Sequence, residues 1–566
     1  MNSTIAAFTA SLLVLTTLIS GCSKPAPDTA SSAADAVAAQ LKQVEADLHE
    51  HTAVLGSDEF EGRAPATPGE EKTVAYLQQE FADLGLLPGN AGSWFQDVPV
   101  TSVTTSPQAV MKIRGADFKR DLAYDTDMMV STQQQVESVS VSDAPLVFVG
   151  YGITAPERNW DDYAGIDVTG KTVVVLINDP GYATQDASVF NGNTMTYYGR
   201  WTYKYEEAAR QGAAAVLIVH ETKPAAYPWE VVTGSWSGPQ IGLTSADKNL
   251  DMVEAEAWVT HEVANELFDA AGLDYKMLKD AAARPGFKAV PMADLAASVT
   301  LENSIESSQS RNVVARLPGS TWPDEHIVYT AHWDHLGTKP EMEGDNIYNG
   351  ASDNASGTAA LFALAKLHLA GDQSPMRSIV FLAVTAEESG LLGSRWYGEN
   401  PLYPLATTVA NLNMDNIYGG IDGRTRDVAV VGFGNSELET YLEIEATAQG
   451  RVLVQEPSPE KGYYYRSDHF NFAKQGVPAL YLTRGVDSLE HGKAWGQNQL
   501  DAYVTNDYHK PSDEYSPDWD LSGAAENVLL FFGIGEALAN SRDWPNWNPG
   551  TEFKSKRDET SAERAE

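Results

Sequence analysis

The C-terminal half of the chain alternates short apolar runs with longer amphipathic segments. Apolar runs of strand length lie at 326–331, 378–385, 409–414, 428–431 and 479–483. Segments with helical periodicity lie among them, at 357–369, 437–448, 469–475 and 524–539. Strands that are apolar throughout and alternate with helices are typical of a parallel sheet covered on both faces. The pattern predicts an α/β fold with a mostly parallel central sheet and helices on both faces.

Two further regions precede this half. Residues 38–55 and 69–86 have the periodicity of helices. Between about 120 and 295 the pattern changes to strand-like runs bounded by Gly and Pro, such as KTVVVLIN at 171–178. We therefore expect one domain built from 38–120 and 296–545, a separate β-rich module inserted at 121–295, and a polar C-terminal tail at 546–566.

The N-terminus has features of an export signal. Residues 5–19 form an apolar run, which is shorter than the roughly 20 residues that a membrane-spanning helix needs. The run ends in Leu-Ile-Ser-Gly-Cys, which resembles a bacterial lipobox, and Cys22 is the only cysteine, so it has no disulfide partner. No Lys or Arg precedes the run, so an ordinary signal peptide with an incidental Cys is the alternative. We expect a signal peptide at 1–21 and a lipidated Cys with a flexible tether at 22–37.

This anchor also predicts a location. Ser23, the residue after the modified Cys22, resembles the residue found there in lipoproteins that are sent to the outer membrane. We expect an exported cell-envelope lipoprotein, attached to the membrane through Cys22 and facing the periplasm or the cell surface.

Composition narrows the class of partner. The chain has 566 residues, of which 43% are hydrophobic and 21% charged, as in a folded globular protein. Its formal net charge is −39. Nucleic-acid binding needs a basic surface, so we expect no nucleic-acid partner. The acidic excess is typical of a soluble surface.

Polar residues follow the predicted strands directly. They are His332, Glu387, Glu388 and Asp415, and a loop just before the helix at 357–369 adds Asp353. Ligands of open α/β sheets bind in the crevice at the carboxyl ends of the strands, so we expect these side chains to converge there. Any one of them alone is more typical of a surface turn or a helix cap.

The residue types suit a metal site. Histidine and carboxylate are zinc ligands, and one carboxylate can bridge two ions about 4 Å apart. Glu387 and Glu388 are neighbours whose side chains point in different directions, so one can bind metal while the other acts as general base. Asp334, two residues after His332, could accept the other imidazole N–H and fix its tautomer.

Several motifs occur in a defined order. They are HWDH at 332–335, SDNASG at 352–357, TAEESGLLGS at 385–394, NMDN at 413–416 and YHKPSDEY at 508–515. Together they resemble the co-catalytic zinc exopeptidases, the family of bacterial leucyl aminopeptidases and glutamate carboxypeptidase. The resemblance spans 311–540 and includes the opening segment LGSDEFEGRAPATPGEEKTVAYLQQEFADLGLLPG.

The resemblance implies two Zn²⁺ ions per chain and a role for each matching residue. His332 and Asp415 would complete the shell of one ion, and Glu388 and His509 that of the other. Asp353 would bridge the two ions.

The same resemblance assigns the proton chemistry. Glu387 matches the general base, and Asp334 matches the residue that supports the first histidine. The implied activity is that of an aminopeptidase, which releases N-terminal residues from peptide substrates by means of a zinc-activated water. A carboxypeptidase or dipeptidase on the same site, a glutaminyl cyclase and a non-catalytic surface binding protein are the alternatives.

The inserted module resembles a protease-associated domain. Its landmarks are VGYGI at 149–153, YAGIDVTGKTVVVLINDPG at 163–181 and KYEEAARQGAAAVLIV at 204–219. The resemblance implies a domain that helps to cover the active-site cleft and carries no catalytic residue, either as a structural lid or as a part that selects the substrate.

Other residues have less defined roles. Asp468 lies in a Ser-Asp-His element that relatives have near the site, where it would support the fold of the cleft or, with His469, act directly. Tyr508 precedes His509 and could contact a tetrahedral intermediate or be a core residue. Arg484 could bind a substrate carboxylate, which would favour a carboxypeptidase.

Overall fold

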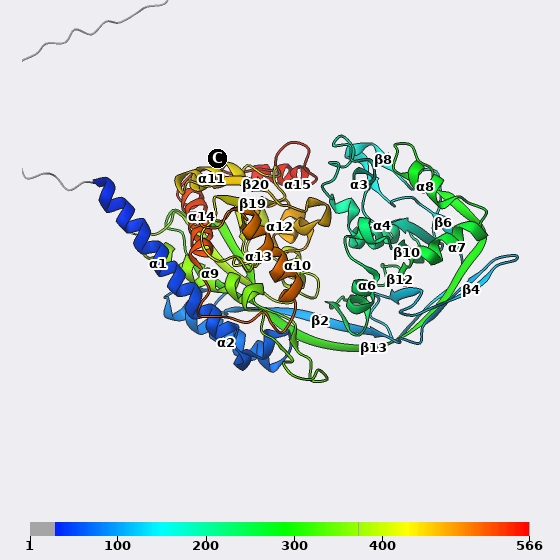
Figure 1. Ribbon diagram of the computed structural model, residues 1–566, viewed down its shortest axis with the longest axis horizontal. Helices are drawn as coiled ribbons and strands as arrows, with labels where there is room; N and C mark the ends of the chain where they lie inside the picture. Colours follow the sequence, from blue (N-terminus) through cyan, green and yellow to red (C-terminus); the bar gives the residue numbers. More distant parts are fainter. Residues whose placement is uncertain (1–28, 372, 565–566) are drawn as a thin grey trace, which may run out of the picture.

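The computed structural model describes residues 29–371 and 373–564 as two lobes (Figure 1). The predicted signal peptide and Cys22 lie outside the described residues. One lobe carries the motifs that resemble the zinc exopeptidases and is called the peptidase domain below. The other lobe, the module, contains most of the residues between strands β2 (Phe95–Thr105) and β13 (Val290–Leu317). Among the described residues, no helix combines the length and the apolar character needed to cross a bilayer.

A mixed sheet forms the centre of the peptidase domain. Its order is β11-β2-β13-β17-β14-β18-β21-β19-β20. The strands of the sheet are β2 (Phe95–Thr105), β11 (Gln240–Leu243), β13 (Val290–Leu317), β14 (Trp322–His332), β17 (Arg377–Val384), β18 (Thr408–Asn413), β19 (Asp427–Val431), β20 (Val452–Gln455) and β21 (Ala479–Arg484), and β1 (Leu87–Pro88) pairs with β13.

The predicted fold class is confirmed. The central strands β17, β14, β18 and β21 run parallel, whereas β13 and β19 pair antiparallel with them at the two sides. Side chains alternate between the faces: Phe381 belongs to the main core, and its neighbours Val380 and Leu382 to the core on the opposite face. Both faces are therefore buried, which explains why the strands are apolar throughout.

Helices cover both faces of this sheet. The main core contains side chains of α1 (Thr29–Leu55), α2 (Pro68–Asp83), α9 (Ser356–Leu369), α11 (Leu438–Ala448) and α14 (Ser522–Ala539). The opposite face is covered by α10 (Leu392–Glu399) and α12 (His469–Lys474). The remaining elements are α13 (Lys493–Asn506), α15 (Lys554–Glu559) and the two short strands β15 (Gly337–Thr338) and β16 (Ile347–Tyr348).

The module has its own sheet and its own core. The sheet order is β4-β3-β13-β6-β9-β10-β12-β5, with parallel pairing from β6 to β12. Its strands are β3 (Val110–Arg114), β4 (Lys119–Ala123), β5 (Met128–Ser131), β6 (Ser138–Phe148), β9 (Thr172–Leu176), β10 (Ala215–Val219) and β12 (Ala255–Val259), besides the small pair β7 (Thr154–Ala155) and β8 (Trp160–Asp161). Its helices are α3 (Pro180–Thr184), α4 (Trp201–Arg210), α5 (Thr222–Ala225), α6 (Trp229–Trp236), α7 (His261–Ala270) and α8 (Tyr275–Ala282).

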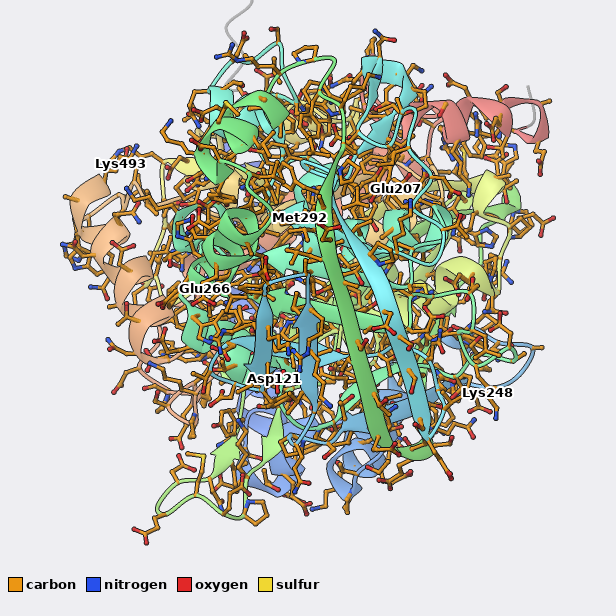
Figure 2. The ribbon with its side chains drawn as sticks, turned by 90° about the vertical axis from the view of Figure 1, so that its right-hand side faces the viewer. Asp121, Glu207, Lys248, Glu266, Met292 and Lys493 are labelled. Atoms are coloured by element: carbon orange, nitrogen blue, oxygen red, sulfur yellow. The ribbon has the colours of Figure 1, made fainter. Side chains whose placement is uncertain are left out.

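One strand joins the two sheets. The first part of β13, residues 290–302, pairs in the module sheet, and the part from 303 to 317 pairs with β2 and β17. The module sheet also includes β3, which precedes the expected boundary at residue 121, and β4, which spans it. Figure 2 looks onto this end of the molecule, where Asp121, Glu266 and Met292 are labelled.

Two terminal segments differ from expectation. Helix α1 already begins at Thr29, so residues 29–37 of the predicted tether are helical, and the many Ala residues there explain this because Ala has the highest helix propensity. The predicted polar tail packs onto the peptidase domain. Trp547 is 1% exposed, and the guanidinium of Arg557 donates hydrogen bonds to the carbonyls of Thr408 and Val409.

Candidate metal centre

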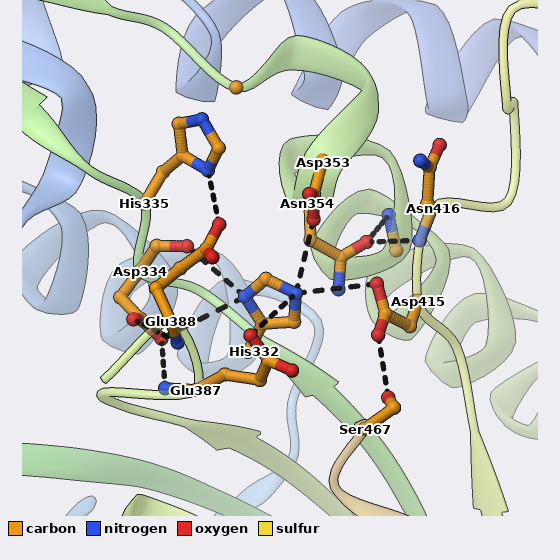
Figure 3. Close-up of polar contacts among 12 residues, drawn as sticks. His332, Asp334, His335, Asp353, Asn354, Glu387, Glu388, Asp415, Asn416 and Ser467 are labelled. Atoms are coloured by element: carbon orange, nitrogen blue, oxygen red, sulfur yellow. Dashed lines mark hydrogen bonds and ion pairs between the residues drawn. The ribbon is translucent and has the colours of Figure 1, made fainter. Parts of the chain in front are cut away.

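His332 is the last residue of β14 and lies at the centre of the site (Figure 3). It is 1% exposed. Its Nε2 lies 3.3 Å from Oδ1 of Asp353 and 3.4 Å from Oδ1 of Asp415. Its Nδ1 lies 3.1 Å from the backbone carbonyl oxygen of Asp334. Nδ1–H therefore donates to this carbonyl, and Nε2 is left free to bind a metal.

Asp353 offers its two oxygens to two different histidines. Oδ1 faces His332, and Oδ2 lies 3.2 Å from Nε2 of His509. The backbone of this segment is fixed by Asp513, whose carboxylate oxygens accept the N–H groups of Ser352 and Asp353 at 3.0 Å each. The geometry suits a carboxylate that bridges two metal ions.

Glu388 follows β17 and faces the second half of the site. Its Oε2 lies 3.1 Å from Nε2 of His509 and its Oε1 2.6 Å from Nδ1 of His335. His335 is fully buried, and a Cβ at the left-handed position Gly350 would collide with its ring. Gly350 thus makes room for a histidine that sequence reasoning did not assign, although it belongs to the HWDH motif.

Asp415 is held from behind by a hydroxyl. It follows β18, and its Oδ2 accepts a hydrogen bond of 2.6 Å from Ser467 Oγ, which leaves Oδ1 directed at His332 (Figure 3). Ser467 belongs to the Ser-Asp-His element noted in the sequence, so the visible contribution of this element is made by its serine.

Glu387 and Asp334 form the third part of the site. Glu387 Oε2 lies 4.0 Å from Nε2 of His332, beside the ligand atoms. The carboxylate of Asp334 does not accept the imidazole N–H of His332 as expected, since its Oδ1 lies 3.8 Å from Nδ1 of His332. Instead, Oδ1 and Oδ2 accept the backbone N–H groups of Glu387 and Glu388 at 3.0 and 3.3 Å. Asp334 therefore supports His332 through its carbonyl and braces the Glu387-Glu388 turn through its side chain.

The donor set fits two zinc ions. Tetrahedral zinc with ligand bonds of about 2.0–2.2 Å separates two ligand atoms by about 3.3–3.5 Å. The contacts of 3.1–3.4 Å among these side chains are close to that value. Among the described residues, two groups of side chains have ligand atoms within 4.8 Å of one another. The first is His332, Asp353 and Asp415, and the second is His335, Asp353 and Glu388.

The electrostatics also call for cations. The side chains of Asp353, Glu387, Glu388 and Asp415 are all at most 13% exposed. Burial raises the pKa of Glu387 well above its usual range; His332 opposes this shift, and the nearby carboxylates add to it. Burial also acts to raise the pKa of Asp353, but His332 and His509 hold it well below its usual range. Like charges gathered in a buried site are costly unless cations join them.

The remaining predicted residues, Tyr508, Asp468 and His469, differ in their exposure to solvent. Tyr508 is 40% exposed, and its ring stacks on that of His509 at 3.9 Å, so it lies at the open side of the site. Asp468 is fully buried, and burial raises its pKa to about 7, with His332 opposing the shift. It belongs to neither of the two groups of potential metal ligands found among the described residues. His469 is also fully buried and belongs to no metal group.

The structure contradicts the prediction that Arg484 binds a substrate carboxylate. It is 5% exposed, and its guanidinium donates to the backbone carbonyls of Tyr418 and Gly423. Because these carbonyls bind its terminal nitrogens, Arg484 stabilises the turn after β18 instead of receiving a substrate carboxylate.

Comparison with known proteins supports this reading of the site. Residues 312–532 match the model of Peptidase family M28. Aminopeptidase NAALADL1 of Mus musculus is 33% identical over 155 residues, which are 26% of this chain and 18% of that protein. A probable zinc metalloprotease of Pyrenophora teres is 27% identical over 233 residues, which are 34% of this chain and 47% of that protein.

A solved structure is also similar over most of the chain. The aminopeptidase from Aneurinibacillus sp. strain AM-1 has a TM-score of 0.48 and 20% identity, covering 88% of this chain and 95% of that one. The chain spans about a fifth of the length of the curated aminopeptidases that it matches. The region that matches the model of Peptidase family M28, residues 312–532, is also the region that carries the motifs from HWDH to YHKPSDEY.

Proposed function

We propose that the chain is an exported, membrane-anchored zinc exopeptidase that releases N-terminal residues from peptides. The observation that carries the proposal is the position of Asp353, whose two oxygens face His332 on one side and His509 on the other. This arrangement suits a pair of metal ions. When bound, the two ions supply Lewis-acid chemistry by polarising the scissile carbonyl and acidifying a water molecule.

The proton chemistry falls to Glu387. Its carboxylate lies beside His332, a position that suits a group that takes a proton from water and returns it to the leaving amine. Asp334 holds the turn that carries it. The direction of cleavage is supported by relatives, since the matched NAALADL1 proteins are named aminopeptidases.

The first test replaces Glu387. Glu387→Gln should lower kcat by about 100- to 10,000-fold, the range for loss of general base catalysis, with an unchanged zinc content by mass spectrometry. Glu341→Gln, at an exposed site of the same domain, is the matched control and should keep full activity. Full activity of Glu387→Gln would refute the assigned role.

The second test determines which end is cleaved. Peptides with a free N-terminus, and the same peptides N-acetylated, are digested with and without a chelator and analysed by mass spectrometry. We expect stepwise loss of N-terminal residues from the free peptides only, abolished by the chelator. Cleavage of the acetylated peptides alone would indicate a carboxypeptidase, and pyroglutamate formation a glutaminyl cyclase. Absence of bound zinc after purification would indicate a binding protein.

The membrane anchor is proposed from the sequence of the N-terminus. The apolar run at 5–19 and the lipobox-like ending at Cys22 support it. Radiolabelled palmitate should enter the wild-type protein during expression in bacteria and should not enter Cys22→Ser. Equal labelling of both, or secretion of both into the medium, would refute the anchor and leave the peptidase proposal intact.

A further inference from the structure

The module contacts the peptidase domain at a second place besides the shared strands. Helix α12 of the peptidase domain faces α4 of the module there (Figure 1), and Nζ of Lys474 on α12 lies 3.7 Å from Oε1 of Glu206 on α4. The module segment 194–206 packs against the peptidase segment 455–474 through this ion pair and through hydrogen bonds near the start of each segment. The peptidase segment includes Ser467, which contacts the metal centre.

Three aromatic rings form the apolar part of this contact. The ring centre of Tyr197 in the module lies 5.0 Å from that of Phe470 and 5.8 Å from that of Tyr465, both in the peptidase domain. The rings of Tyr465 and Phe470 pack edge to face at 5.2 Å. Aromatic rings at such distances attract each other beyond the effect of buried area alone. We call Tyr197, Tyr465 and Phe470 the aromatic clamp.

The module fixes the position of Tyr197 from two sides. The hydroxyl of Tyr197 donates to the carboxylate of Glu206, whose two oxygens both lie 2.7 Å away. The preceding residue, Thr196, is bound by the fully buried Asp179, whose Oδ2 accepts the backbone N–H of Thr196 at 2.9 Å and its hydroxyl at 2.7 Å. The ring of Tyr197 therefore moves with the module and not with the peptidase domain.

The other two residues of the clamp enclose Ser467 in the chain. Tyr465 precedes Ser467 by two residues, and Phe470 donates its backbone N–H to the carbonyl of Ser467 at 3.1 Å. The hydroxyl of Ser467 donates to Oδ2 of Asp415 at 2.6 Å (Figure 3). Oδ1 of the same carboxylate lies 3.4 Å from Nε2 of His332. The position of the Ser467 hydroxyl therefore sets the orientation of a proposed metal ligand.

We propose that Tyr197 is a positioning residue of the metal centre: through the aromatic clamp, the module holds the turn that carries Ser467 and so orients Asp415 for metal binding. The inference rests on the metal pair of the proposed function. It predicts an effect on one of the two ions, because Glu388, proposed as a ligand of the other ion, is held by His335 instead. The module thereby contributes to metal affinity without supplying a ligand.

The test measures zinc affinity in Tyr197→Leu, by calorimetric titration of the metal-free protein. Tyr198→Leu is the matched control, because the ring of Tyr198 packs on Phe190 and Tyr203 inside the module, at 5.7 and 5.0 Å, and Tyr197 also packs on Tyr203, at 5.5 Å. We expect Tyr197→Leu to lower the affinity of one site by about 3- to 10-fold, somewhat less than the loss of a group that touches a metal ligand directly. The control should bind both ions as the wild type does.

A double-mutant cycle shows whether the effect passes through Ser467. Ser467→Ala removes the hydroxyl that holds Asp415 and should lower the affinity of the same site by about 10- to 100-fold. If Tyr197 acts through this hydroxyl, adding Tyr197→Leu to Ser467→Ala lowers the affinity no further, whereas independent effects multiply. Tyr197→Phe keeps the ring of the clamp and should keep the wild-type affinity. Multiplied effects in the cycle would refute the inference, since a general loss of packing produces them.

Failure of this inference and failure of the proposed function give different results. Two bound zinc ions with equal affinities in Tyr197→Leu and wild type refute the positioning role and leave the peptidase proposal standing, as does an equal loss at both sites. A wild-type protein that binds no zinc refutes both.

A second variant keeps the test decisive if Tyr197→Leu does not fold. Glu206→Ala changes a side chain that is 31% exposed and removes the acceptor of the Tyr197 hydroxyl and the partner of Lys474. It should lower the affinity of the same site, and unchanged affinity would refute the inference.

Discussion

The carboxylate of Asp334 accepts a hydrogen bond from the backbone N–H of Glu387, with Oδ1 3.0 Å from the amide nitrogen. The backbone carbonyl of the same Asp334 lies 3.1 Å from Nδ1 of His332. One residue thus positions two functional groups by two different atoms. The carbonyl orients His332, the proposed metal ligand, and the carboxylate fixes the turn that carries Glu387, the proposed general base.

Asp334→Asn should therefore separate the two functions. The asparagine keeps the backbone carbonyl and so keeps His332 in place. Its side-chain NH₂ group, however, replaces a carboxylate oxygen that accepts a backbone N–H, so this hydrogen bond is lost. We expect kcat to fall by about 10- to 100-fold, as for other groups that orient catalytic residues, with nearly unchanged zinc affinity. Steady-state kinetics and a zinc titration with a competing chelator measure both. A large loss of zinc affinity with unchanged kcat would show that the side chain acts on His332 instead.

His335 should control the affinity for the second zinc ion. Its Nδ1 lies 2.6 Å from Oε1 of Glu388, so it holds the carboxylate whose Oε2 faces His509. His335→Asn removes this contact, and we expect zinc affinity at one of the two sites to fall by about 10- to 100-fold. Calorimetric titration of the metal-free protein measures the two sites. His491→Asn, at an exposed histidine, is the control; equal behaviour of both variants would contradict the assignment.

The convergence of the residues that follow the strands could be predicted from the sequence because one physical rule governs it. Carboxyl ends of parallel strands meet at one edge of a sheet, so His332, Glu388 and Asp415 had to converge once their strands were recognised. The apolar runs were visible because both faces of the sheet are buried. The partition of β13 between two sheets was not visible, since strand pairing is decided by distant segments.

The residues that orient the ligands were harder to predict. His335, Asp513 and Ser467 act through the direction of their side chains, which depends on the packing of segments far apart in the chain. The sequence alone could not show that Arg484 is bound by backbone carbonyls of its own fold.

Arg63, the arginine of the opening segment, should tolerate substitution poorly. It is 1% exposed, and its guanidinium donates to the carbonyls of Trp333, Leu55, Asn349 and Gly350, next to the HWDH motif. A lysine ammonium has three donors on a single nitrogen and cannot span these four carbonyls. We expect Arg63→Lys to destabilise the peptidase domain by about 3–5 kcal/mol, as for other broken buried charge networks.

Thermal and urea unfolding test this expectation. Arg395→Lys is the matched control because Arg395 is half-exposed and pairs with Glu399 at 2.8 Å, where surface ion pairs contribute only about 0–1 kcal/mol. Equal midpoints for the two variants would mean that the four carbonyls find other donors.

The stability of the module should fall as pH rises from mildly acidic to mildly basic values, and Glu256 on β12 should be a main cause. This carboxyl is 2% exposed, accepts a hydrogen bond of 2.6 Å from Gln133, and has its pKa raised by burial to about 8. Because the folded state holds the proton more tightly than the unfolded state, the stabilisation is complete below the unfolded pKa of about 4.5 and is lost as pH rises through about 8.

Glu256→Gln keeps a neutral, hydrogen-bonding side chain and should flatten this dependence of stability on pH. Hydrogen exchange of strand 255–259 between pH 5 and 9 measures it, with exposed Glu262→Gln as the control; a slope that Glu256→Gln leaves as steep as the wild type would assign the effect to another group.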